Sequence, residues 1–258
     1  MTTVVTGSAS GIGRAVRARL EAAGEQVLGV DLHDAEVVAD LADPAARRAA
    51  VLQITRLAPV LRGAVTCAGL GPLPDRDPAL LVSLNHFGTV DLLAGLRPLL
   101  APGAAVVAVS SNSTTCQPGV PQRLVDACLA GDEGAAREVA RGIATMDGVY
   151  PATKTAVAHW VRAQAPAWVA DGVRLNAVAP GLVETAMTAE MRADGTVAPL
   201  LAAFPLPMGR GATADEIAAV VTWLLSDESA VVVGALLVCD GGTDALLRPR
   251  SVPPPWVL

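Results

Sequence analysis

The sequence predicts a single-domain α/β fold, a doubly wound parallel sheet of about seven strands with helices on both faces. Short Val-rich runs alternate with amphipathic segments rich in Ala, Leu and Arg along the 258 residues. The Val-rich runs are almost continuously apolar, as strands are when helices cover both of their sides. Hydrophobic residues make up 52% of the chain and charged residues 17%, so material for a large core is available.

Each element follows from its own stretch of sequence. The first half contains TVVTG, a helix from Gly13 to about Ala23, QVLGVD, a short EVVADL and a helix over about 44–60. Then come GAVTCAG, a helix over about 79–99 and AAVVAVSS. The second half contains a helix over about 150–170, VRLNAVAP, a helix near 213–226 and ALLVCDGG. This order predicts one domain spanning residues 1–258.

Two segments interrupt the alternation. Residues 112–149 hold NSTTCQPGVPQ and then RLVDACLAGDEGAAREVARG, which predicts an inserted helical segment with one helix in its second part. Residues 182–212 have weak periodicity and predict a lid over a substrate. The tail LRPRSVPPPWVL is expected to be extended, because three prolines cannot continue a helix.

Composition excludes several classes of function. A net charge of −6 argues against a nucleic-acid partner, since phosphate binding needs a basic surface. The apolar runs are shorter than the roughly 20 residues of a membrane-spanning helix, and no secretory leader is visible. Four scattered cysteines without a CxxC predict free thiols in a reducing cytoplasm. Three isolated histidines show no metal-ligand spacing, so no metal is expected.

A glycine-rich turn follows the first strand. The stretch TGSASGIG covers residues 6–13 and places glycines at 7, 11 and 13. Glycines allow a tight turn and a close approach of a pyrophosphate to the backbone, and the following helix offers free N–H groups to that anion. A plain tight turn is the alternative, but the position between the first strand and the first helix favours a dinucleotide site. Its expected members are Gly7, Ser10, Gly11, Ile12 and Gly13.

An acidic residue follows at the spacing expected for a ribose contact. Asp31 ends the second strand, 31 − 13 = 18 residues after Gly13. An acid at about this distance accepts hydrogen bonds from the adenosine ribose and repels a 2′-phosphate. No Lys or Arg follows directly, so the sequence favours NAD over NADP. A solvated loop aspartate is the alternative.

The only tyrosine of the chain, Tyr150, lies four residues before Lys154. This spacing places both side chains on one face of a helix. The ammonium group would favour the phenolate and lower the pKa of the phenol, which makes Tyr150 a candidate general acid/base. By itself the pair would also suit an ordinary surface contact.

The combination of motifs resembles the short-chain dehydrogenase/reductase family. TGSASGIG, the CAG at 67–69, Asn85 in LNHFG, the SS at 110–111, YPATK and NAVAPGLVET occur in the family's order over nearly the whole chain. The stretches GVDLHDAEVVADL, CAGLGP and PMGRGA are most similar to its 3α-hydroxysteroid dehydrogenase/carbonyl reductase branch. Aryl and allylic alcohol dehydrogenases of the coniferyl alcohol type share much of the pattern. The resemblance implies a Rossmann fold.

The resemblance also implies catalytic roles. Tyr150 would exchange a proton with the substrate oxygen, and Ser111 would position that oxygen. Lys154 would lower the pKa of the tyrosine and hold the nicotinamide ribose, while Asn85 would anchor a water that links Lys154 to solvent. Ser110 or Ser113 could replace Ser111 as the working serine, and Asn85 could instead brace helices. Further cofactor contacts implied by the family are Asp40, Leu41, Cys67, Ala68, Gly69, Pro180, Gly181, Val183 and Thr185, together with Tyr150 and Lys154.

The chain departs from the family pattern in two places. Thr66 and Cys67 stand where the family commonly has two asparagines. The gap between Ser111 and Tyr150 is 150 − 111 = 39 residues, far longer than in most members. The inserted segment would cover the substrate or displace a helix-pair interface, which predicts a homodimer through another face or an altered homo-oligomer.

The segment 182–212 also bears on the substrate. Its flexible apolar side chains suit a bulky apolar alcohol or ketone, although they could simply pack the lid against the core. These residues are Met187, Met191, Leu200, Leu201, Phe204 and Met208. The sequence therefore predicts an NAD-dependent enzyme that interconverts an apolar secondary alcohol and its ketone. The alternatives are an aryl or allylic alcohol dehydrogenase and, in another class, a non-catalytic NAD-sensing module.

Overall fold

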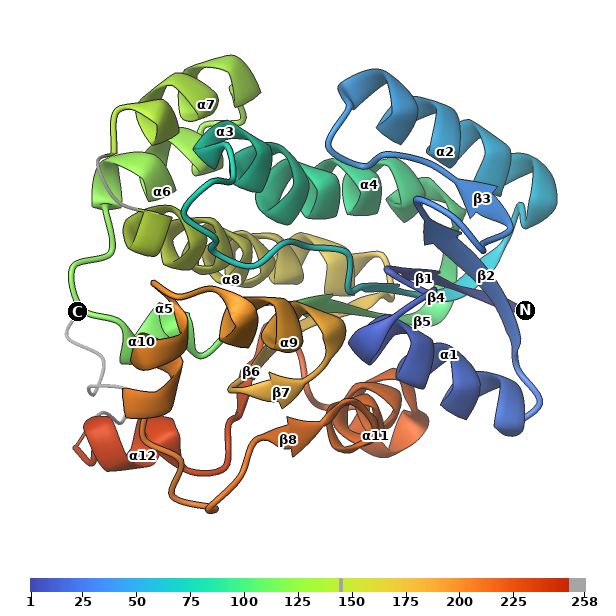
Figure 1. The fold of residues 1–258 in the computed structure, drawn as a ribbon. Coiled ribbons are helices and arrows are strands. Elements are labelled where there is room, and N and C mark those ends of the chain that lie inside the picture. The colour runs from blue at the N-terminus through green and yellow to red at the C-terminus, as the bar shows by residue number, and fades with distance from the viewer. Residues whose placement is uncertain (144–145, 251–258) are drawn as a thin grey trace, which may run out of the picture.

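A parallel sheet of seven strands forms the centre of the molecule, as predicted (Figure 1). The computed structural model describes residues 1–143 and 146–250. The strand order is β3-β2-β1-β4-β5-β6-β9, and every neighbouring pair runs parallel. The strands are β1 (Thr2–Thr6), β2 (Gln26–Asp31), β3 (Val37–Val38), β4 (Leu61–Thr66), β5 (Leu100–Val109), β6 (Arg174–Pro180) and β9 (Leu236–Cys239).

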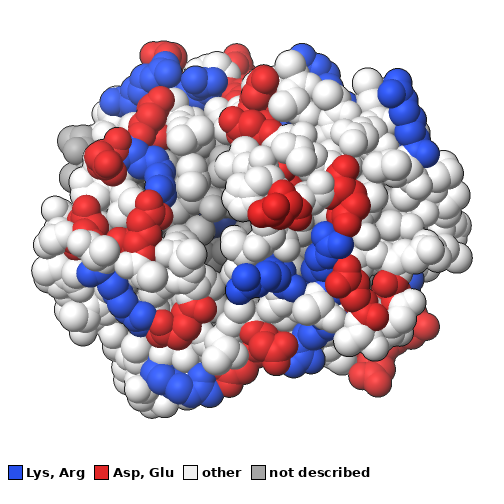
Figure 2. All heavy atoms as spheres, turned by 45° about the vertical axis from the view of Figure 1, so that its right-hand side comes forward, with Lys and Arg blue, Asp and Glu red and all other residues white. Residues whose placement is uncertain are grey.

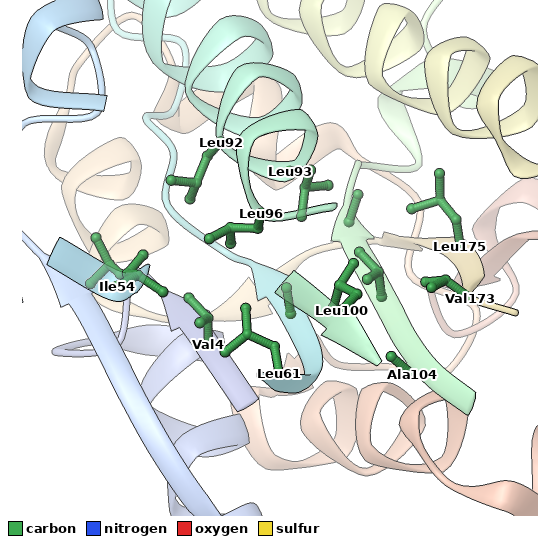
Figure 3. Packing of buried hydrophobic residues seen from close by; sticks show 14 of the residues in the cluster. Val4, Ile54, Leu61, Leu92, Leu93, Leu96, Leu100, Ala104, Val173 and Leu175 are labelled. Carbon is green, nitrogen blue, oxygen red and sulfur yellow. The ribbon is translucent and has the colours of Figure 1, made fainter. Parts of the chain in front are cut away.

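Helices cover both faces of this sheet. On one face lie α1 (Gly11–Ala22) and α11 (Ala214–Leu225), whose side chains share one apolar cluster with β1, β4, β5 and β6. The other face carries α2 (Pro44–Leu57), α4 (Gly88–Leu96) and α8 (Met146–Ala170). Figure 3 shows leucines of α4 pointing toward Val4 and Leu61 of the sheet. The core is aliphatic, with Trp168 and Phe87 as its largest fully buried side chains.

The strand order reverses beside β1. Strand β1 pairs with β2 on one side and with β4 on the other, so the two halves of the sheet wind in opposite directions. In such sheets a crevice opens at the carboxyl ends of the strands where the winding reverses. The glycine-rich turn follows β1 directly, and Asp31 is the last residue of β2. The topology therefore brings the predicted phosphate and ribose contacts to one edge.

The helix expected over 79–99 is continuous in space but not regular. It consists of α3 (Pro78–Leu81), a π-helical segment η1 (Val82–Phe87), α4 and the 3₁₀ turn η2 (Arg97–Leu99). The whole span Pro78–Leu99 is long and apolar enough to cross a membrane, yet 72% of its most apolar window is buried inside the molecule. Its apolar character thus reflects packing in the core.

The inserted segment forms three helices instead of the expected pattern with one. They are α5 (Ser113–Cys116), α6 (Gln122–Leu129) and α7 (Glu133–Arg141). The predicted single helix over 123–142 is wrong because Gly131 adopts φ +80° and Asp132 then caps α7 through the backbone N–H of Ala135. Side chains of α6 and α7 form a separate apolar cluster with α3, η1 and the first turns of α8.

The segment 182–212 contains a short pair of parallel strands and two helices. Strand β7 (Val183–Glu184) pairs with β8 (Ala212–Thr213), and α9 (Ala186–Ala193) and α10 (Ala198–Ala203) lie between them in the chain. The chain continues after α11 with η3 (Asp227–Ser229), β9 and α12 (Thr243–Leu247). Most of the Pro-rich tail, residues 251–258, lies outside the described residues.

The surface carries charges of both signs. On the face shown in Figure 2, acidic and basic side chains are interspersed. Ion pairs in the structure include Arg19 with Asp215 and Arg17 with Glu36. A mixed surface of this kind on a chain with net charge −6 differs from the basic stripe of a nucleic-acid binder.

Candidate active site

The glycine-rich turn packs so tightly that side chains would not fit. A Cβ atom on Gly13 would lie 2.2 Å from the backbone oxygen of Gly7, and one on Gly7 would lie 2.8 Å from the backbone nitrogen of Ala68. Gly7 also adopts φ +66°, a region that favours glycine. Helix α1 then begins at Gly11, with no side-chain cap from Ser10 and no acidic residue in its first turn. Its free N–H groups therefore fit a dinucleotide pyrophosphate.

Asp31 is fixed at the end of β2. One of its carboxylate oxygens accepts a hydrogen bond from the backbone N–H of Ala9 at 2.9 Å, and the other accepts from Leu32 at 2.7 Å. The carboxylate thus faces the glycine turn and is oriented by two donors. Each oxygen keeps a lone pair for a ribose hydroxyl.

The residues that follow the carboxyl end of β4 are hydrogen-bonded to β1. The hydroxyl of Thr6 accepts hydrogen bonds from the backbone N–H groups of Cys67 at 3.1 Å and Ala68 at 3.0 Å. Burial raises the pKa of the Cys67 thiol to about 12, so this thiol is protonated and unreactive at neutral pH. A Cβ on Gly69 would lie 3.0 Å from Oδ1 of Asn85 and 3.6 Å from Nζ of Lys154. The backbone at 67–69 therefore passes close to the polar centre of the site.

Three predicted catalytic side chains come together at the carboxyl end of β5. Tyr150 and Lys154 lie on one face of α8, with Nζ of Lys154 5.9 Å from the centre of the phenol ring. The lysine ammonium donates a hydrogen bond to the backbone oxygen of Val109 at 3.0 Å. Ser111 is buried, and its hydroxyl accepts a hydrogen bond from the backbone N–H of Ser113 at 3.1 Å. The same hydroxyl acts on the phenol of Tyr150 by lowering its pKa.

The geometry separates the three candidate serines. The hydroxyl of Ser110 donates to the backbone oxygen of Lys154 at 2.8 Å and so serves to hold β5 against α8. The hydroxyl of Ser113 has no partner among the described residues. Of the three, Ser111 is the serine that affects the pKa of the Tyr150 phenol, and its role in positioning the substrate oxygen stays a prediction.

The acid–base properties differ from the sequence expectation. Burial raises the pKa of Tyr150 above its ordinary value, while the hydrogen bond from Ser111 opposes this shift. Burial also lowers the pKa of Lys154 to about 8. The direction is opposite to the one expected from the Tyr150–Lys154 spacing, because burial disfavours the charged phenolate. The lowering of the tyrosine pKa by Lys154 stays a prediction.

Asn85 lies behind the site. Its side chain is fully buried in the π-helical segment, and it both donates to and accepts from the backbone of Leu70, at 3.0 and 2.8 Å. Among the described residues it does not line the cavity. Asn85 therefore holds the loop at Leu70 and not a second helix, and both roles considered from the sequence, bracing helices and anchoring a water, stay predictions.

One cavity of about 490 Å³ joins these features. Every predicted cofactor contact lines it: Gly7, Ser10, Gly11, Ile12, Gly13, Asp31, Asp40, Leu41, Cys67, Ala68, Gly69, Tyr150, Lys154, Pro180, Gly181, Val183 and Thr185. Other residues that line the cavity were not predicted from the sequence, among them Val30, His33, Pro72, Asn112, Gln117 and Leu182. A polar residue such as Gln117 had no motif to mark it, because it lies in the insertion.

The segment 182–212 closes one side of this cavity. Met187, Met191, Leu200, Leu201 and Phe204 line it. Met208 does not; it is half-exposed and packs against Gly241 instead. The hydroxyl of Thr185 caps α9, and its methyl group faces Gly11. The apolar wall and the glycine turn therefore meet at Thr185.

Known proteins are similar to this chain in sequence and in fold. A family profile described as enoyl-(acyl carrier protein) reductase matches residues 135–244. A 3-alpha-hydroxysteroid dehydrogenase/carbonyl reductase of Comamonas testosteroni is 38% identical over 96% of this chain and 98% of its own. A coniferyl-alcohol dehydrogenase of Pseudomonas sp. is 30% identical over 93% of this chain and 94% of its own. The crystal structure of the 3-alpha-hydroxysteroid dehydrogenase from Pseudomonas sp. B-0831 complexed with NADH matches with a TM-score of 0.93 and 38% identity, covering 98% of this chain and 100% of that one.

Proposed function

We propose that this chain, which belongs to the short-chain dehydrogenase/reductase family, interconverts an apolar secondary alcohol and its ketone with NAD. It is an oxidoreductase of that family. The observation that carries the proposal is the meeting of Tyr150, Ser111 and Lys154 in the same cavity as the glycine turn and Asp31. The 3-alpha-hydroxysteroid dehydrogenase/carbonyl reductase relative supports a bulky apolar substrate.

Each residue has a step that its position permits. Tyr150 is protonated at neutral pH, since its pKa is raised, and can donate its proton to a ketone oxygen. Ser111 can hold that oxygen against the phenol. Lys154, with a pKa of about 8, is mostly charged at neutral pH and can stabilise the phenolate that remains. A nicotinamide held in this cavity would supply or accept the hydride.

NAD is favoured over NADP because a 2′-phosphate would meet the carboxylate of Asp31. The apolar wall of Met187, Met191 and Phe204 suits an apolar alcohol or ketone. A cytoplasmic location agrees with the four free cysteines.

Replacement of Tyr150 tests the proposal. With Tyr150→Phe, turnover should fall by about 10²- to 10⁴-fold because the proton donor is lost, while NADH binding should persist. A panel of steroid, terpene and phenylpropanoid alcohols, each assayed with NAD and with NADP by the absorbance of the reduced cofactor, identifies the class of substrate. A chain that binds NADH but oxidises none of these alcohols, whether Tyr150 is present or not, would instead fit a non-catalytic sensor.

We also propose a homodimer through a face other than that of α8. The insertion packs its own helices against the first turns of α8 and so covers that face. Strand β9 ends the sheet, and Val231, five residues before it, is 94% exposed; Trp223 of α11 is 38% exposed, so apolar side chains are available on other faces. Light scattering should give the mass of a dimer; a tetramer would contradict this assembly.

A further inference from the structure

The wall that carries Ser111 holds polar atoms that the proposed reaction does not use. This wall is the segment 111–117, which includes the single turn of α5. Two of its hydroxyls are satisfied locally: Thr114 donates to the backbone oxygen of Ser111 at 2.9 Å, and Thr115 donates to that of Asn112 at 3.2 Å. Two other side chains of the same turn, Ser113 and Gln117, are not satisfied.

The hydroxyl of Ser113 and the amide oxygen of Gln117 are both buried without a hydrogen-bond partner among the described residues. Ser113 is only 7% exposed, and both residues line the cavity that contains Tyr150. They are four residues apart and joined by the 3.3 Å hydrogen bond from the N–H of Gln117 to the oxygen of Ser113. The i,i+4 spacing places both side chains on one side of the turn.

Burying a polar atom without a partner is unfavourable, at about 1–3 kcal/mol for each group. A binding site retains such atoms when a ligand satisfies them, and a site built in this way discriminates strongly against analogues that lack the matching group. The hydroxyl of Ser113 can donate or accept, whereas the oxygen of Gln117 only accepts. The pair therefore suits a hydroxyl group, which can donate to Gln117 and accept from Ser113.

We propose that Ser113 and Gln117 form a second polar subsite that binds a hydroxyl group of the substrate other than the reacting one. The inference rests on the proposed function. The Cα atoms of Ser111 and Ser113 are at most about 7.6 Å apart, and Gln117 is about 6 Å further along the turn. The second hydroxyl thus binds to the same wall of the cavity as the reacting oxygen, at a separation that a fused-ring substrate can span, while Met187 and Met191 line the cavity for the apolar remainder.

A matched pair of ketones tests the subsite. The probes are two saturated 3-ketosteroids that differ only in a hydroxyl on the ring next to the ketone-bearing ring. The unmodified chain should reduce the hydroxylated ketone with a kcat/KM about tenfold or more above that of the other. With Gln117→Leu this preference should disappear, because the hydroxylated ketone loses its acceptor while kcat/KM for the other ketone persists. Ser113→Ala should reduce the preference in the same direction.

Gln122→Leu is the matched control, since Gln122 lies in the same insertion but not among the cavity-lining residues, and it should leave the preference intact. Equal use of both ketones by the unmodified chain would overturn the subsite and leave the proposed function standing. An equal loss with both ketones in Gln117→Leu, or a change in NADH binding alone, would also overturn it. Reduction of neither ketone would overturn the proposed function, and the subsite with it.

Discussion

Arg47 connects the part of the cavity wall near Leu41 with the insertion, and its replacement gives a stringent test of the structure. Its side chain is 3% exposed and reaches the backbone oxygens of Leu41 at 3.0 Å and Ser83 at 3.3 Å. It also forms ion pairs with Glu133 of α7 and, at 3.2 Å, with Asp91 of α4. Leu41 lines the cavity, so Arg47 holds a part of the cavity wall.

The partners set the expected magnitude for Arg47→Met. Glu133 has a side chain only 15% exposed, so removing Arg47 leaves a nearly buried carboxylate without its cation. Breaking a buried pair in this way costs about 3–5 kcal/mol. Removing Glu133 instead leaves Arg47 with Asp91 and the backbone oxygens, so Glu133→Gln should cost less, about 1–3 kcal/mol. The double variant should lose less than the sum of the two, because neither charge is then left without the other.

Urea unfolding at neutral pH measures these free energies, and titration with NADH measures the cofactor site. Arg47→Met should also weaken NADH binding, since the backbone oxygen of Leu41 loses its anchor. Arg48→Met is the control: Arg48 is the exposed neighbour, and its replacement should change the free energy of unfolding by less than about 0.5 kcal/mol. Strict additivity of the double variant, or a loss below about 1 kcal/mol for Arg47→Met, would refute the buried pair.

Three further predictions follow from single contacts. The pKa of Lys154 is about 8 in the folded chain, against an ordinary value of 10.5. Between pH 8 and 10.5 the lysine is therefore protonated in the unfolded chain and largely neutral in the folded chain, so the free energy of unfolding rises with pH. In urea unfolding without cofactor, the free energy of unfolding of the unmodified chain should rise by about 3 kcal/mol more than that of Lys154→Met between pH 8 and 10.5. The same pH dependence in both chains would contradict this. Asp31→Ser should raise kcat/KM with NADP at least about tenfold by removing about 1–4 kcal/mol of repulsion, and unchanged kinetics would place the 2′-phosphate elsewhere. Gly13→Ala should abolish NADH binding in a fluorescence titration, because its Cβ would lie 2.2 Å from the oxygen of Gly7, whereas Gly195→Ala points into open space and should bind normally.

The sequence predicted the fold well because the parallel sheet leaves strong local signals. Strands buried on both faces read as continuous apolar runs, and the turn after β1 needs glycine for steric reasons that the coordinates display at Gly7 and Gly13. The boundaries of α2 and α11 were predicted to within three residues. The insertion was harder: α6 and α7 carry a shared helical pattern, and only the positive φ of Gly131 separates them.

The candidate site was predictable where spacing encodes geometry. Tyr150 and Lys154 share a helix face, and Asp31 ends a strand, so both placements follow from local structure. Contacts between distant segments were not predictable. No local pattern marks Arg47, 86 residues from Glu133, as its buried partner, or Asn85 as a brace for Leu70. The direction of the Tyr150 pKa shift was also missed, because it depends on burial that only the packed cavity reveals.

The insertion is connected to both ends of the cavity. Its helix α6 packs on α8, and Tyr150 itself lies against the apolar cluster that Leu124 and Val125 form with the first turns of that helix. Its helix α7 reaches the cavity wall at Leu41 through Glu133 and Arg47. Its first turn presents Ser113 and Gln117 to the cavity. The segment that departs most from the family pattern therefore contacts α8 and Arg47 and supplies side chains to the cavity wall. We expect specificity for the substrate to follow changes in this segment before changes in the sheet.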